Sequence, residues 1–78
     1  MTNEELNRLI AESIKAEKTA LTYAVKAARA TVAAARAWYE LAQADPASRP
    51  EDIEHFRKNL SLAQLKLEQA ESDRRFWN

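Results

Sequence analysis

Apolar residues in the C-terminal half of the chain recur in alternating steps of three and four. The series is Ile53, Phe56, Leu60, Ala63, Leu67, Ala70 and Trp77, with Arg74 as the one polar residue in its rhythm. This spacing is typical of a helix that packs along a second helix. The N-terminal half repeats the rhythm with Leu21, Val25, Ala28, Val32, Ala35, Tyr39 and Ala42. The pattern therefore predicts two helices that pack along each other.

Local signals set the boundaries of the first helix. Thr2 is expected to be the N-cap, with Glu5 three residues on as its capping-box partner. A residue that precedes proline is disfavoured in the α region, so Asp45, which precedes Pro46, should end this helix. The sequence predicts a helix over about 3–44.

The second helix begins after a stretch that holds both prolines. Ser48 and Glu51 fit a second capping box, and Pro50 suits the first turn of a helix, where no N–H acceptor is available. We expect one domain over 1–78, made of the first helix, a proline-containing turn over 45–49 and a second helix over about 50–77.

The predicted fold class is all-α, an antiparallel two-helix hairpin. At about 1.5 Å per residue the first helix is roughly 60 Å long and the second roughly 40 Å. The first turns of the longer helix therefore extend past the shorter one. That extension carries large apolar residues that need a cover: Leu6, Leu9, Ile10 and Ile14.

The first helix has a second apolar series on a different side. It consists of Ala16, Ala20, Tyr23, Ala27, Ala30 or Thr31, Ala34, Trp38 and Leu41. A single neighbouring helix cannot cover both sides, and alanine rows let helices approach closely. We expect the same face of a second copy to cover it, giving a homodimeric four-helix bundle. The alternative is that these alanines reflect only helix propensity on a solvated surface.

A third group of apolar residues lies on the second helix, opposite its seam. Leu62, Leu65 and Phe76 are expected on this side, and Arg75 and Trp77 beside them are residue types enriched at binding hot spots. We predict a partner-binding surface there. The alternative is scattered surface hydrophobes, and the pattern leaves open whether a second copy or a different protein would bind.

Two charged residues interrupt the seams at about the same height. Glu17 follows Ile14 and precedes Leu21 on the first helix, and Arg74 lies on the second. We expect both side chains to be buried and to form a structural ion pair, Glu17 with Arg74, that sets the register of the hairpin.

Composition narrows the class of protein. The 78 residues include no cysteine, no glycine and one histidine, so disulfides are excluded and association is the stabilising device left to a chain this small. Twelve basic residues balance twelve acidic ones, which gives no overall field to attract a polyanion. No apolar run reaches 18 residues, so we expect a soluble, cytoplasmic protein.

Catalytic chemistry finds little support in the residues. His55 has Glu51 and Asn59 one turn away on either side, but metal sites of the catalytic type normally hold more histidine or cysteine. No serine has an obvious base, and a glycine-rich phosphate loop is impossible without glycine. We predict neither an enzyme nor a cofactor or metal site.

The middle of the first helix carries a basic stripe. It consists of Arg8, Lys15, Lys18, Lys26, Arg29 and Arg36. Such a stripe could follow a phosphate backbone, although Glu4, Glu12 and Glu40 share that side.

These features favour a non-catalytic protein–protein interaction module: an adaptor, co-chaperone or inhibitor that acts through exposed helix faces. The alternatives are a hairpin dimer that binds nucleic acid through Lys15, Lys26, Arg29 and Arg36, and a subunit of a helical filament or secretion assembly. The architecture resembles that of small secretion-needle subunits, their helical co-chaperones and compact phage-encoded inhibitors. A shared architecture does not assign a function.

Overall fold

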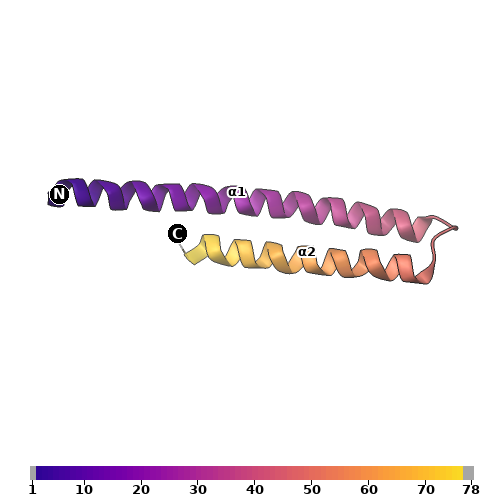
Figure 1. The fold of residues 1–78 in the computed structure, drawn as a ribbon. Helices are drawn as coiled ribbons and strands as arrows, with labels where there is room; N and C mark the ends of the chain where they lie inside the picture. The colour runs from indigo at the N-terminus through magenta and orange to yellow at the C-terminus, as the bar shows by residue number, and fades with distance from the viewer. Residues whose placement is uncertain (1, 77–78) are drawn as a thin grey trace.

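The computed structural model describes residues 2–76, which form an all-helical hairpin (Figure 1). Helix α1 spans Asn3–Ala44 and helix α2 spans Pro50–Phe76. The two helices run antiparallel and pack against each other, as the heptad rhythm predicts. Because α2 is shorter, its C-terminal end lies beside the middle of α1, and the N-terminal turns of α1 extend beyond it.

Thr2 is the N-cap of α1, as the sequence predicts. Thr2 has an extended backbone, and its hydroxyl oxygen accepts a hydrogen bond from the Glu5 amide at 3.2 Å. This bond satisfies one of the first-turn amides that have no partner within the helix. Glu4 and Glu5 lie in the first turn, where their charge suits the positive end of the helix dipole.

The turn between the helices is organised by Asp45. Its backbone is extended, as expected before proline, and its side-chain Oδ1 accepts a hydrogen bond from the Ala47 amide at 2.9 Å. The Ser48 amide then donates to the Asp45 carbonyl oxygen at 3.1 Å. These two bonds form a compact turn without any residue of positive φ, at least among the described residues.

The predicted capping box of α2 is wrong. The side-chain bond at this helix start runs from the Arg49 amide to Asp52 Oδ2, at 3.4 Å. The Arg49 carbonyl accepts the first helical hydrogen bonds, from the amides of Asp52 and Ile53. The cap is therefore one residue later than Ser48, because Pro50 occupies the first helical position and Asp52 lies within reach of the cap.

The core lies along the predicted seams. Val25, Val32, Ala42 and Ala63 are its buried residues. All other seam positions through residue 70 are partly buried, whereas Arg74 is exposed and Trp77 lies outside the described residues. The buried residues are small, so the two helices can lie close together. The larger Tyr39, Phe56 and Leu60 are half-buried.

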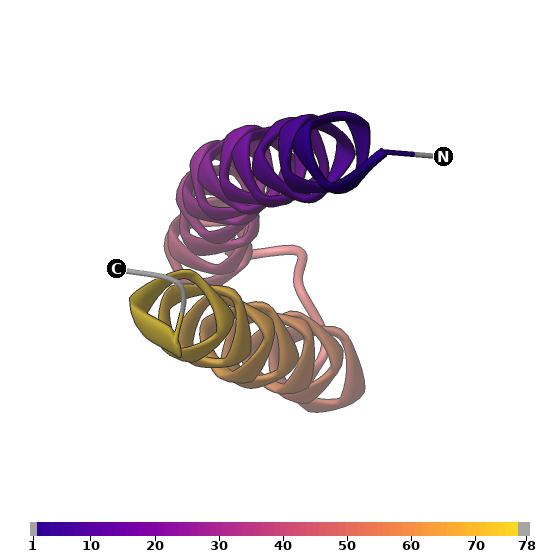
Figure 2. The ribbon, with the colours of Figure 1, turned by 90° about the vertical axis from the view of Figure 1, so that its left-hand side faces the viewer.

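Figure 2 looks along the hairpin from its open end and shows α1 and α2 as one pair of rods. The dimensions are 67 × 18 × 14 Å and the radius of gyration is 19.2 Å, whereas a compact domain of this length has about 11–12 Å. The shape therefore buries one side of each helix only. In the part of the chain described here, neither helix is long and apolar enough to cross a membrane.

Candidate interaction surfaces

The second apolar side of α1 is exposed along its length. Its alanines all lie at the surface, and Tyr23, Trp38 and Leu41 are 67%, 56% and 56% exposed. We call this set the alanine face: Ala16, Ala20, Tyr23, Ala27, Ala30, Ala34, Trp38 and Leu41. All of these residues remain exposed in the hairpin, so they form an apolar surface that is available to another helix.

Trp38 has a second role that the sequence pattern does not predict. Its ring stacks on Phe56 of α2, with centroids 6.1 Å apart and planes 12° from parallel. The stack joins the edge of the alanine face to the edge of the hairpin core. A spacing argument assigns Trp38 to one side of α1, but a large side chain can reach across to a neighbouring helix.

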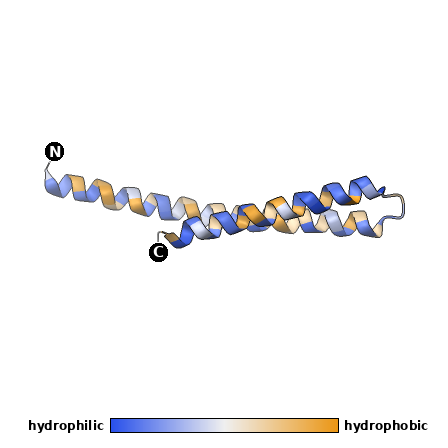
Figure 3. Ribbon diagram, turned by 90° about the horizontal axis from the view of Figure 1, so that it is seen from below, coloured by the Kyte–Doolittle hydropathy of each residue, from blue (hydrophilic) through white to orange (hydrophobic). Residues whose placement is uncertain are grey.

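The extension of α1 forms a second exposed apolar surface. Leu6, Leu9, Ile10 and Ile14 are all exposed, and Figure 3 shows apolar segments along the part of α1 that α2 does not accompany. An isolated helix is only marginally stable in water, and helices in proteins gain most of their stability from packing. Contact with another surface would therefore stabilise this extension.

An open groove of about 400 Å³ lies at the closed end of the hairpin. Trp38, Leu41 and Phe56 supply apolar walls, and Asp45 and Asp52 supply carboxylates at the turn. Two of these walls belong to the alanine face. The groove therefore continues that face toward the turn.

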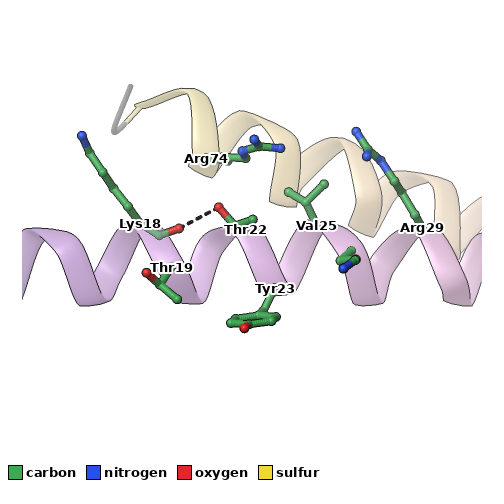
Figure 4. Close-up of a pocket in the computed structure, with 8 residues that line it drawn as sticks. Lys18, Thr19, Thr22, Tyr23, Val25, Arg29 and Arg74 are labelled. Atoms are coloured by element: carbon green, nitrogen blue, oxygen red, sulfur yellow. Dashed lines mark hydrogen bonds between the residues drawn. The ribbon is translucent and has the colours of Figure 1, made fainter.

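A second groove, of about 460 Å³, lies between α1 and the last turns of α2, and we call it the basic groove. Its lining includes the cations Lys18, Lys26, Arg29 and Arg74. Figure 4 shows Lys18 and Arg29 rising from α1 on either side of Arg74, whereas Tyr23 projects from the opposite side of α1. The hairpin thus adds a cation of α2 to the predicted basic stripe of α1, a juxtaposition that no spacing along one helix can predict.

The burial expected for Glu17 and Arg74 is wrong, because both side chains are exposed. The inter-helix ion pair within residues 2–76 is Arg29 with Glu71, whose Nη2 and Oε1 are 3.8 Å apart. Both partners of this pair are well exposed, so its contribution to stability is small. Arg74 reaches into the basic groove instead of a buried seam. A pair between Glu17 and Arg74 stays a prediction.

The outer side of α2 presents the predicted partner-binding residues to solvent. Leu62 is 56% exposed and Leu65 61%, one turn apart on the side opposite the core. Phe76 is exposed three turns further on, and Arg75 is exposed beside it. Trp77, the remaining member of the predicted set, lies outside the described residues.

The polar side of α2 holds its own hydrogen bonds. Arg57 Nε donates to Glu54 Oε2 at 2.8 Å, and Arg57 Nη2 pairs with Glu54 Oε1. This two-point contact lowers the pKa of Glu54 below its ordinary value and raises that of Arg57. His55 Nε2 lies 3.3 Å from the Asn59 amide nitrogen and packs edge-on against Phe56.

Helical periodicity predicts some of these surface residues and not others. The alanine face and the outer residues of α2 lie where helical periodicity places them. The two grooves depend on how α2 is placed against α1, so the sequence pattern does not predict them. The basic stripe of α1 indicates only one wall of the basic groove. Comparisons with protein-family models, with curated proteins and with solved structures find no match to this chain.

Proposed function

We propose that the protein is a non-catalytic interaction module that acts as a homodimer and binds a further protein. The observation that carries this proposal is the alanine face, which runs along α1 from residue 16 to residue 41 and whose residues all remain exposed in the hairpin. An apolar face of this length on a soluble hairpin is typical of a protein interface.

The exposed area supports association of two copies. The chain exposes 6306 Å², whereas a compact folded chain of 8.9 kDa exposes about 4,800 Å². The difference is about 1,500 Å², and a standard interface buries about 800 Å² on each partner. The chain therefore exposes enough surface beyond that of a compact chain to supply its side of a stable dimer interface.

The outer side of α2 supports contact with a different protein. Leu62 and Leu65 lie opposite the hairpin core, so a dimer formed through α1 would leave them exposed. Apolar anchors on one helix face suit an adaptor, co-chaperone or inhibitor that presents a helix to a groove of its target.

The homodimer can be tested with glutamate substitutions. Ala27→Glu together with Ala34→Glu should reduce the mass in light scattering from two chains to one and lower the helicity, because the carboxylates would be buried without partners. Ala33→Glu is the control for the single variant Ala27→Glu. It adds the same charge at an exposed position outside the alanine face and should leave the dimer intact.

Three results would decide the test. A wild-type mass of two chains at tens of micromolar supports the proposal. A mass of one chain overturns it. A mass that grows with concentration without limit would instead support a filament subunit.

A second candidate function is nucleic-acid binding, favoured by the basic groove. This groove is lined by Lys18, Lys26 and Arg29 of α1 and by Arg74 of α2. Lys15 and Arg36 precede and follow the three α1 cations along that helix. Against it, the net charge is zero and Glu71 pairs with Arg29. Phosphate contacts release counterions, so binding of this kind would weaken linearly with the logarithm of salt concentration, whereas apolar contact would respond little.

A further inference from the structure

We propose that two copies pack antiparallel through their alanine faces, in a register that places each bulky residue of one face opposite an alanine of the other. This inference rests on the proposed homodimer and specifies its geometry. Facing residues in this register have numbers that add to about 57, so the two-fold axis crosses the alanine face between Ala27 and Ala30.

The order of large and small residues along α1 carries the inference. Moving along the face, alanines come first, and the bulky Trp38 and Leu41 come last. An antiparallel copy therefore brings bulky residues to alanines. The facing pairs are Ala16 with Leu41, Ala20 with Trp38, Tyr23 with Ala34, and Ala27 with Ala30. Alternation of large and small side chains across an interface lets the two layers interdigitate.

Other arrangements lose this complementarity. A parallel pair would place Tyr23 against its own copy and Trp38 against its own copy, which forces the helices apart. An antiparallel shift of one heptad in one direction sets Tyr23 against Leu41, bulky on bulky. The opposite shift sets Leu41 against Leu9, and Trp38 against Glu12. Among these arrangements, the register near 57 spreads the volume most evenly along the contact.

The exposures agree with this register. Tyr23 and Leu41 are more than half exposed in the single hairpin, so each has apolar surface to contribute. Trp38 is held by Phe56 and presents its remaining surface in a fixed place, which favours a defined register.

The register also gives the extension of α1 a place. Leu9 lies on the same side as Ala16, seven residues earlier, and comes to the height of Ala47 and Ser48 of the second copy. Those residues line the groove at the closed end of the hairpin. The extension of each copy thus lies beside the turn of the other, and that groove becomes part of the interface.

Single cysteines test the register directly, because the chain has none of its own. Ala16→Cys and Leu41→Cys are prepared separately, then mixed, exchanged and oxidised under mild conditions. The mixture should form a disulfide-linked heterodimer, since the two positions face each other. Either variant alone should not cross-link, because its own position lies about 38 Å away on the other copy. Ala33→Cys mixed with Leu41→Cys is the control and should stay unlinked.

An exchange of side-chain sizes tests the same register by equilibrium measurement. Ala34→Tyr should weaken the dimer roughly tenfold or more, because two tyrosines would then meet. Tyr23→Ala should also weaken it by leaving a gap. The double variant exchanges the pair and should return the dimer dissociation constant close to that of the wild type. Ala33→Tyr should have no effect, and circular dichroism of each variant reports whether it is folded.

The outcomes separate the two proposals. A single-chain wild-type mass would overturn the proposed homodimer together with this register. A two-chain mass with cross-linking of either single variant, or with a double variant no tighter than Ala34→Tyr, would overturn the register alone. The heterodisulfide and the recovery of affinity together would establish it.

Discussion

Val25 is the most deeply buried side chain in the described part of the chain, with 1% of its surface exposed. It lies in a core that contains few large residues, so the hairpin depends strongly on each of them. Val25→Ala should lower the free energy of unfolding by about 2 kcal/mol, because it removes two buried methyl groups and leaves a cavity. Urea unfolding followed by circular dichroism measures this change. Leu62→Ala, on the exposed outer side of α2, should change the unfolding free energy by less than about 0.5 kcal/mol.

Glu54 and Arg57 form the best-aligned charged contact of residues 2–76. Because the arginine lowers the pKa of Glu54, the folded state favours the ionised carboxyl, and this stabilisation is present above the ordinary pKa of 4.5 and lost as the pH falls below it. Glu54→Gln should therefore lower Tm slightly at pH 7, and the difference from wild type should shrink in acid. The Glu40 carboxyl has no hydrogen bond or ion pair within the described residues, so Glu40→Gln is the control and should leave Tm at pH 7 close to that of the wild type.

At the level of single residues, the periodicity predicts which side of a helix a residue occupies but not what its side chain touches. Val25 and Ala63 are buried where the heptad places them. Trp38 lies on the predicted side too, yet its ring reaches Phe56 because rotamer choice extends a large side chain sideways. Arg74 fits the rhythm and is nevertheless exposed, since the core does not extend to the last turns of α2.

The two helix starts show when a local signal is sufficient. Thr2 has no competing cap, so its prediction is confirmed. Near α2 both Ser48 with Glu51 and Arg49 with Asp52 have the three-residue spacing of a side chain bonded across the first turn. The backbone conformation around Pro50 selects the second pair.

The first turns of α1 should be sensitive to their cap because α2 does not support them. Thr2→Ala removes the bond to the Glu5 amide and should cost about 1 kcal/mol of local helix stability. Faster amide hydrogen exchange in residues 5–9 would report the loss.

Thr19→Ala is the matched control for the cap. The Thr19 hydroxyl donates a hydrogen bond to the Lys15 carbonyl oxygen of the same helix, at 3.0 Å. Alanine has the higher helix propensity, so this change should slow exchange slightly or leave it unchanged. Equal acceleration of exchange in both variants would contradict the role given to Thr2.

The hairpin as a whole follows from a single break in an otherwise uniform helix-forming sequence. Glycine is absent and the two prolines lie four residues apart, so the chain has one place to reverse. Its exposed surfaces cannot be assigned to particular partners in the same way. Apolar periodicity indicates that a side needs a cover, whereas the identity of the cover depends on shape in a second molecule.

The overall dimensions of the dimer follow from the register and can be measured by small-angle X-ray scattering. Centring the pair between Ala27 and Ala30 lets each α1 project about ten residues beyond the end of the other, so the pair measures roughly 80 Å from end to end. The single hairpin is 67 Å long. A parallel pair would keep close to that length, and an end-to-end pair would approach twice it. A maximum dimension near 80 Å with the mass of two chains is the expected result, whereas 67 Å or 130 Å at that mass would contradict the antiparallel register.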